Sequence, residues 1–176
     1  MTSTFGTVPG GGQAKGDSPR PLRYSLGPDA TAMSHHPPFT PGRTRFESEM
    51  QVRPDDLDMN AHVHASKYLD YVLAARYDQM ARCYGMSMEA FFELGLNWFT
   101  RTSHVEYKRP LKLGERFVVR TWIQEFAKDG VRVEFEILKR DTGKLAADGW
   151  GHFTLVNVKT GRAVPLPPEI VAKYAV

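Results

Sequence analysis

The spacing of apolar residues becomes regular at Phe46. FESEMQVR (46–53) alternates apolar and polar positions as an edge strand does, and Pro54 ends the alternation. Over about 65–84, apolar residues recur every three or four positions, which predicts one long amphipathic helix that stops before Gly85. The apolar positions of this helix are Leu69, Val72, Leu73, Tyr77, Met80, Ala81 and Tyr84.

A second, shorter helix is expected from Ser87, a suitable N-cap, to Leu94. Four strand-like runs follow, at about 99–108, 116–126, 131–140 and 145–158, with turn residues at 129–130 and at 141–143. One strand, one long helix and an antiparallel meander predict an α+β domain whose sheet wraps around the helix.

Residues 1–45 differ from the rest of the chain. They contain seven glycines and seven prolines and no sustained apolar period, so they cannot bury enough surface to offset the entropy of ordering. We therefore predict a disordered Gly/Pro-rich tail over 1–45 and one folded domain over 46–176. No apolar segment follows a basic start, which argues against a signal peptide, and either Met1 or Met33 can be the start.

Charge and cysteine content narrow the partners and the compartment. The tail supplies the net charge of +3, and residues 46–176 hold 18 basic and 18 acidic residues. A neutral domain without a basic face predicts no nucleic-acid partner, and no run of 18 apolar residues indicates a membrane span. The single cysteine, Cys83, excludes an internal disulfide and fits a reducing compartment, so we expect a cytoplasmic protein.

Candidate chemistry lies directly before the long helix, where Asp58, Asn60 and His62 occupy every second position. In an extended segment this spacing points all three side chains to one side. The free backbone N–H groups at the start of the helix would polarise a carbonyl oxygen while the carboxylate waits within reach. Those N–H groups belong to Val63, His64, Ala65 and Ser66. The arrangement suits hydrolysis of an activated acyl group.

The same segment carries a family resemblance. DLDMNAHVHASKYLDY (56–71) resembles the Asp-x-Asp-x-x-x-His-Val-Asn-Asn-x-x-Tyr-Leu signature of hotdog-fold acyl thioesterases. These include the 4-hydroxybenzoyl-CoA and long-chain acyl-CoA type and the plant acyl-carrier-protein type. Two later segments also resemble sequences of this family. They are HVEYKRPLKLGE (104–115), which resembles the family's Tyr-Arg-Arg-Pro strand and turn, and TGKLAADGWGHFTLVNVKTGRAVPLP (142–167), which resembles its last long strand. The likeness implies a hotdog fold, with an antiparallel sheet wrapped around one long central helix, assembled as a homodimer or homotetramer.

The resemblance also implies roles for single residues. Asp58 corresponds to the catalytic aspartate and would act as nucleophile or as general base, with an Asx turn at the start of the helix as the alternative. Asn60 and His62 would orient water and substrate, with a structural histidine as the alternative for His62. Glu106 corresponds to a strand glutamate that supplements the site in some members, or is an ordinary outward carboxylate. Lys108 and Arg109 are candidates for phosphate contacts.

The chain departs from the signature at Ala61, where many relatives have glycine, and at His64 and Ala65, where they have two asparagines. His62 and His64 lack a third ligand nearby, so we expect no metal and no cofactor. Asp56 is expected to be a turn or structural residue.

The expected activity is hydrolysis of acyl-CoA thioesters to a free carboxylic acid and CoA. The alternatives are an acyl-carrier-protein thioesterase and a non-catalytic module that binds acyl-CoA. Apolar residues of the helices and of the segment after them could wall an acyl tunnel or simply fill the core. They are Leu69, Val72, Leu73, Tyr77, Phe91, Phe92, Leu94, Leu96, Trp98 and Phe99.

Overall fold

The computed structural model describes residues 44–176. The tail predicted over 1–45 lies outside this range apart from its last two residues. Every strand and both helices expected from the sequence are present, with ends that differ by a few residues. The elements are β1 (Phe46–Gln51), η1 (Pro54–Asp56), α1 (Lys67–Arg82), α2 (Met88–Glu93), β2 (Leu96–Tyr107), β3 (Arg116–Phe126), β4 (Gly130–Lys139), β5 (Leu145–Asn157) and α3 (Pro168–Tyr174).

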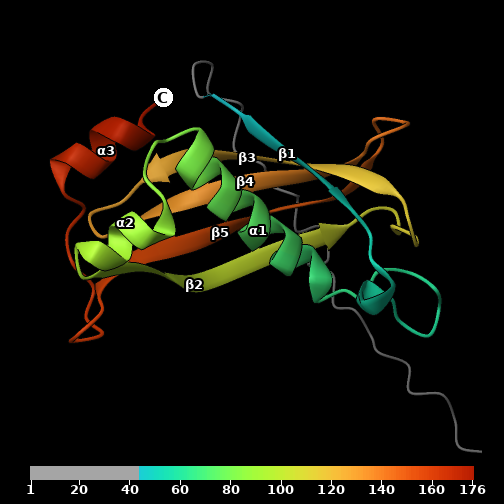
Figure 1. Ribbon diagram of the computed structural model, residues 1–176, viewed down its shortest axis with the longest axis horizontal. Helices are drawn as coiled ribbons and strands as arrows, with labels where there is room; N and C mark the ends of the chain where they lie inside the picture. Colours follow the sequence, from blue (N-terminus) through green and yellow to red (C-terminus); the bar gives the residue numbers. More distant parts are fainter. Residues whose placement is uncertain (1–43) are drawn as a thin grey trace, which may run out of the picture. The chain divides into compact units, whose positions relative to one another are not determined.

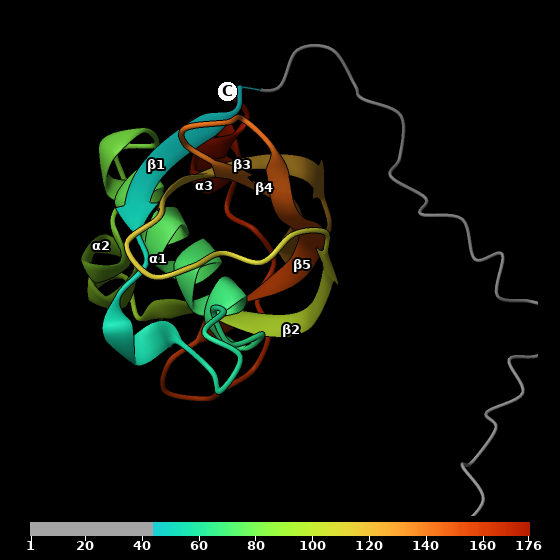
Figure 2. The same cartoon turned by 90° about the vertical axis from the view of Figure 1, so that its right-hand side faces the viewer.

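The strands form one antiparallel sheet in the order β1-β3-β4-β5-β2. Strands β3, β4 and β5 pair consecutively, whereas β1 and β2 form the two edges. Figure 1 shows α1 crossing one face of this sheet, and the end-on view in Figure 2 shows the strands curving around the helix. This arrangement confirms the prediction of an α+β hotdog fold.

Two apolar clusters hold α1 against the sheet, one at each end of the helix. The first contains Val52, Tyr68, Tyr71, Val72, Ala75, Phe117, Val119, Phe135 and Ile137, among others. The second contains Met80, Tyr84, Met88, Phe91, Val133, Leu155, Ile170 and Tyr174, among others. Between them α1 carries two buried polar residues, Arg76 and Gln79. A polar layer therefore separates the two halves of the core.

That layer corrects the predicted face of the long helix. Tyr77 and Ala81 were expected to face the core, yet Tyr77 is 55% exposed and Ala81 is also exposed. Arg76 and Gln79 take their place on the buried side, where Thr121 of β3 bonds to both. Hydrophobic spacing alone assigns polar residues to the exposed side of a helix. It cannot show that residues distant in sequence will form hydrogen bonds with them in the core.

The helix α3 was not predicted, because seven residues next to prolines are too few to show a helical period. It is held by Tyr174, whose ring stacks on Tyr84 with centroids 4.3 Å apart. At the other end of the described chain, the Thr44 N–H donates a hydrogen bond to the Val176 carbonyl at 3.1 Å. The Arg45 guanidinium lies over the Trp122 ring at 4.1 Å. The ordered contacts thus reach two residues further toward the N-terminus than the domain boundary predicted at Phe46.

Candidate active site

The segment before α1 is a tight turn, which corrects the expectation of an extended segment. The Asp58 N–H donates to the His62 carbonyl at 2.8 Å, and the Ala61 N–H donates to the Asp58 carbonyl at 3.1 Å. Leu57 and Val63 form an isolated antiparallel bridge that closes the turn. Ala61 has a φ of 57°, in the left-handed region where glycine is favoured. The alternation of Asp58, Asn60 and His62 therefore does not place their side chains in one row.

The Asp58 carboxylate organises this turn. Its Oδ1 accepts hydrogen bonds from the Asn60 N–H at 2.8 Å and from the His62 N–H at 3.3 Å. The Asn60 N–H is the main cause that lowers the pKa of Asp58, and the His62 N–H adds to it. These bonds form an Asx turn, which was the alternative considered for Asp58, at the position expected for the catalytic aspartate. Both backbone bonds go to Oδ1, so Oδ2 accepts no backbone hydrogen bond within residues 44–176.

Asp58 opens onto a pocket of about 350 Å³ at the N-terminal end of α1. The loop before the helix contributes Asp58, His62 and Ala65 to its wall, and the end of β2 with the segment that follows it contributes residues 107–110. Asn60 is exposed at the tip of the turn and does not line this pocket. The structure therefore brings together two of the three residues that the sequence placed in one row. The other lining residues are Val63, Tyr68, Tyr107, Lys108, Arg109 and Pro110.

Only one of the four backbone N–H groups expected to face a substrate remains unused within residues 44–176. The Val63 N–H donates to the Leu111 carbonyl at 2.9 Å, and the His64 N–H donates to the Asp56 carbonyl at 2.8 Å. The Ser66 N–H donates to Nδ1 of His64 at 3.2 Å. The Ala65 N–H has no hydrogen bond in this part of the chain, and Ala65 lines the pocket. It is the candidate oxyanion donor, at the positive end of the α1 dipole.

Two tyrosines that the sequence analysis did not single out frame this donor. The Tyr107 hydroxyl donates to the Ala65 carbonyl at 3.0 Å. Its ring packs edge-on against Tyr68, with centroids 5.1 Å apart. The Tyr68 hydroxyl accepts the Leu111 N–H at 3.2 Å. Both tyrosines lie within the quoted motifs, so the motifs were the signal that could have identified them.

Lys108 and Arg109 line the same pocket as Asp58. Lys108 is paired with Glu106, and its Nζ lies 3.7 Å from Oδ1 of Asp148. Nη1 of Arg109 donates to the Leu145 carbonyl at 2.9 Å. The pocket is therefore lined by a carboxylate and two cations.

Glu106 does not line the pocket of Asp58 and pairs instead with neighbouring residues of β2 and the segment after it. Its carboxylate pairs with Lys108, which is the main cause of its lowered pKa, and with Nε2 of His104 at 3.4 Å. In the strand register Glu106 faces Asp148, whereas its neighbour Tyr107 turns inward toward the helix. Within one chain the structure does not bring Glu106 to Asp58.

Asp56 is structural, as expected, since its side chain is 1% exposed. Its Oδ2 accepts the Tyr71 hydroxyl at 2.7 Å and the Arg53 N–H at 3.0 Å. Burial acts to raise the pKa of Asp56, but these hydrogen bonds lower it overall. His64, the second histidine of the pair considered for a metal, has Nδ1 2.9 Å from the Ser66 hydroxyl. No group of three potential metal ligands occurs in residues 44–176.

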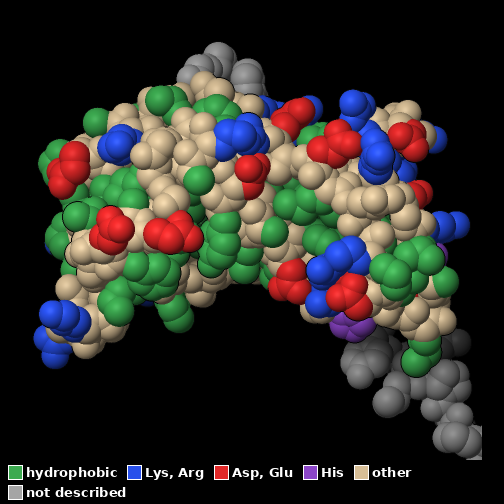
Figure 3. All heavy atoms as spheres, in the orientation of Figure 1, with side chains coloured by type: hydrophobic (Ala, Val, Ile, Leu, Met, Phe, Trp, Pro, Cys, Tyr) green, Lys and Arg blue, Asp and Glu red, His purple; other side chains and the backbone are tan. Residues whose placement is uncertain are grey.

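A second, apolar pocket lies further along α1, between this helix and the sheet. In Figure 3, hydrophobic side chains gather where the surface is hollowed below the middle of the molecule. Leu73, Tyr77 and Trp98, three of the residues considered for an acyl tunnel, line this pocket. Val72 and Phe91 fill the core instead, whereas Phe92, Leu94 and Phe99 are largely exposed.

Comparison with known proteins decides the family. The model of the thioesterase-like superfamily matches residues 52–174. The chain belongs to this superfamily. It is 23% identical over 129 residues to the long-chain acyl-CoA thioesterase FadM of Escherichia coli, a match covering 73% of this chain and 96% of that protein. It is 27% identical over 119 residues to the L-carnitine dehydrogenase/betainyl-CoA thioesterase of Rhizobium meliloti, covering 66% of this chain but 23% of that protein.

Solved structures share the fold. The DHNA-CoA thioesterase from Staphylococcus aureus superposes with a TM-score of 0.70 at 20% identity, covering 74% of this chain and 89% of that one. A second Staphylococcus aureus protein, solved in complex with CoA, gives a TM-score of 0.68 at 22% identity, covering 76% and 83%. The hotdog fold of this superfamily member is therefore independently supported. In residues 44–176, no helix has the length and apolar character needed to cross a membrane.

Proposed function

We propose that this superfamily member hydrolyses acyl-CoA thioesters to a free carboxylic acid and CoA. One observation carries the proposal: Asp58 and Ala65, whose N–H is unused within residues 44–176, line the same pocket as Lys108 and Arg109. A base and an oxyanion donor are the two groups that thioester hydrolysis needs from a protein. The relatives named as acyl-CoA thioesterases support the same activity. No cofactor enters this chemistry.

In the proposed reaction the thioester carbonyl oxygen accepts the Ala65 N–H, and water attacks the carbonyl carbon while Asp58 takes its proton. The C–S bond then breaks, CoA leaves as a thiolate, and the proton held by Asp58 neutralises it. His62 lines the pocket beside Asp58 and would orient the water. Asn60 would act through its backbone N–H, which holds the carboxylate in place.

If Asp58 acts as the nucleophile, the oxygen atom added to the product acid can come from Asp58 instead of water. Its oxygen would attack the carbonyl carbon, expel the thiolate and form a mixed anhydride that water cleaves. A single turnover in ¹⁸O-labelled water separates the two routes. General-base catalysis places ¹⁸O in the first product acid, whereas attack by Asp58, followed by water attack on the enzyme carboxyl, leaves that acid unlabelled.

Lys108 and Arg109 would hold phosphates of CoA, since both are cations on the rim of the pocket. The relative solved in complex with CoA supports CoA rather than a carrier protein as the thiol. In the same proposal the cytoplasm is the compartment, because the lone Cys83 needs no oxidising environment.

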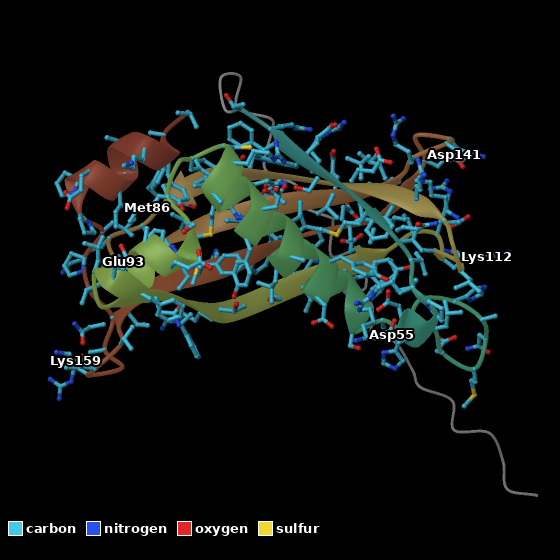
Figure 4. The ribbon with its side chains drawn as sticks, in the orientation of Figure 1. Asp55, Met86, Glu93, Lys112, Asp141 and Lys159 are labelled. Carbon is cyan, nitrogen blue, oxygen red and sulfur yellow. The ribbon has the colours of Figure 1, made fainter. Side chains whose placement is uncertain are left out.

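The decisive experiment is turnover of a panel of acyl-CoA thioesters by wild type and Asp58→Asn, followed with a thiol-reactive dye. The amide keeps the shape and loses the base, so kcat should fall on the order of 10²-fold or more. Asp55→Asn is the matched control, because Asp55 lies on η1 beside the site and is exposed (Figure 4). Equal turnover by wild type and Asp58→Asn would reject the mechanism, and an inactive wild type that binds acyl-CoA would indicate the binding module.

We further propose that two copies pair through β2. This edge strand is exposed over residues 99–104 and therefore presents backbone groups to a partner strand. A two-fold axis beside β2 would set the open pocket of each copy against the other chain and could bring a partner's Glu106 closer to it. Light scattering of the full chain tests this proposal.

A further inference from the structure

The apolar pocket along α1 contains a feature that a purely hydrocarbon ligand does not require. Most of its wall is apolar, formed by Leu73, Met80, Trp98, Val133 and Phe153, among others. The exception is Arg76, which lines the same pocket although its side chain is only 6% exposed. A guanidinium is always charged and is costly to bury without an opposite charge.

The partners of Arg76 are neutral. Nη1 donates to the Tyr84 hydroxyl at 3.4 Å and to the Thr121 hydroxyl at 3.2 Å, and the guanidinium lies 5.2 Å from the Tyr84 ring centroid. Within residues 44–176 no carboxylate lies within 4 Å of it, and no hydrogen bond is made by Nη2 or Nε. Three of the five N–H donors of the guanidinium are thus left for a ligand.

Among the described residues, Arg76 is linked to a carboxylate only through a relay of neutral groups. Thr121 accepts from Arg76 and donates to Oε1 of Gln79 at 2.5 Å, and Nε2 of Gln79 donates to the Ser48 hydroxyl at 3.2 Å. The Ser48 hydroxyl donates to Oδ2 of Asp78 at 2.5 Å. This relay fixes the guanidinium in place. It does not neutralise the charge, because Asp78 is itself paired with Arg82.

Trp98, which lines the same pocket, carries a second unsatisfied donor. Its indole Nε1 is buried and has no hydrogen-bond partner among the described residues. A buried donor left unpaired costs free energy, so a ligand acceptor that reaches it would satisfy it. The unsatisfied groups of Arg76 and Trp98 are donors, which indicates a ligand group that accepts hydrogen bonds.

The apolar pocket and the candidate active site lie at successive positions along α1. Leu69, Leu73, Arg76 and Met80 recur at intervals of three or four and so share one side of α1. Arg76 follows Lys67, the first residue of α1, by nine residues, which at 1.5 Å per residue is roughly 14 Å along the helix, and Ala65 lies two residues before Lys67. An extended acyl chain of about that length, with its thioester carbonyl at Ala65, would reach Arg76 with its far end.

We propose that the preferred substrates are acyl-CoA thioesters whose acyl chain ends in a carboxylate, which the Arg76 guanidinium and the Trp98 indole N–H bind at the far end of the pocket. This inference rests on the proposed function and specifies its substrate class. An ionised carboxylate provides the missing opposite charge and accepts from both donors. A methyl end provides neither.

Two matched series of CoA thioesters, from four to sixteen carbons and ending in either methyl or carboxylate, test the inference on the full chain. At the best length, kcat/KM should favour the carboxylate end on the order of tenfold or more. Arg76→Met should abolish this preference while keeping turnover of the methyl series, and Trp98→Phe should reduce it about threefold. Lys159→Met is the control, since it removes an exposed cation that does not line this pocket. A wild type that favours methyl ends at every length, or an Arg76→Met enzyme that keeps the preference, overturns the inference and leaves the thioesterase proposal standing.

A binding experiment distinguishes failure of this inference from failure of the proposed thioesterase function. Calorimetric titration of the wild type compares a saturated diacid with the monoacid of equal length. Tighter binding of the diacid, weakened in Trp98→Phe, supports the pocket even where no thioester is hydrolysed, in which case the proposed function alone fails. Equal binding of the two acids overturns the inference. Trp98→Phe leaves the polar layer of Arg76 and Gln79 intact. If Arg76→Met fails to fold, the effect of Trp98→Phe on diacid binding therefore tests the inference.

Discussion

The Tyr107 hydroxyl donates a hydrogen bond to the Ala65 carbonyl at 3.0 Å. This contact ties the end of β2 to the residue whose N–H is the candidate oxyanion donor. Between the two segments lies the pocket that Asp58 lines. The position of the donor therefore depends on a strand that is distant in sequence, and this dependence can be tested.

Tyr107→Phe should lower kcat about tenfold, because a small misplacement of an oxyanion donor is costly in the transition state. KM should change little, since the ring still packs against Tyr68. Steady-state kinetics with one acyl-CoA measure both constants. Thr160→Val is the control, because it removes an exposed hydroxyl from a residue that lines neither pocket. An unchanged kcat in Tyr107→Phe would remove Tyr107 from the site.

The pH profile of turnover should show an acid limb below the ordinary aspartate pKa of 3.8, because the Asn60 N–H, helped by the His62 N–H, lowers the pKa of Asp58. The active form is the carboxylate, so activity should stay flat as pH falls toward 3.8 and should be lost only below it. Circular dichroism at each pH, with return to neutral pH, separates titration from unfolding. An acid limb near pH 6.5 would point to an imidazole as the essential base.

The buried pair of Tyr71 and Asp56 should make stability depend on pH. Tyr71→Phe removes a hydrogen bond to a buried carboxylate and should lower the free energy of unfolding by about 1.5 to 3 kcal/mol at neutral pH. The pKa of Asp56 is lowered in the folded state, so its contribution is present above the ordinary 3.8 and is lost as pH falls through the folded pKa.

Urea unfolding of wild type and Tyr71→Phe at several pH values checks that sign. The gap between the two proteins should be constant from pH 7 to about 5 and should close below 3.8. Tyr77→Phe serves as the control for stability, since loss of a hydroxyl from an exposed tyrosine should cost little at any pH. A gap that widens in acid would contradict the assignment of Asp56 as ionised.

The elements could be predicted from the sequence more completely than the site. Strands β3, β4 and β5 and the helix α1 follow from local periodicity, which their own residues carry. The buried side of α1 does not, because Arg76 is accommodated by Thr121, 45 positions away. The seven-residue α3 shows no period and is held through Tyr174.

The signature before α1 indicated which residue types form the site, but not their geometry. Asp58 was expected as a base and is one of the residues that line the pocket. Which backbone N–H stays unused is decided by the carbonyls of Leu111 and Asp56, which occupy those of Val63 and His64. No pattern within the motif reveals those partners, so the selection of Ala65 required the fold.

Ala61 offers a stability test of the same turn. Its φ of 57° is strained for a residue with a Cβ, at a cost of order 1 to 3 kcal/mol, whereas glycine tolerates it. Glycine also gives the unfolded chain more conformational entropy, which opposes part of this gain. Ala61→Gly should therefore raise the melting temperature by about 2 to 4 °C. Ala61→Val should lower it, because a branched side chain fits that region worst. Calorimetry measures both, and a lower melting temperature for Ala61→Gly would show that the turn relaxes.

The exposed edge of β2 should control assembly. The chain has a mass of 19.9 kDa, so light scattering of the wild type should give twice that mass. Thr102→Glu combined with Ser103→Glu sets like charges opposite each other where two copies of β2 would pair, and this should shift the mass toward the monomer. Gln51→Glu, on the other edge strand β1, should leave the mass unchanged. If the pair completes each pocket, kcat should fall with the dimer fraction across a dilution series. A wild type that stays monomeric at assay concentration, or dissociation caused by Gln51→Glu alone, would exclude pairing through β2.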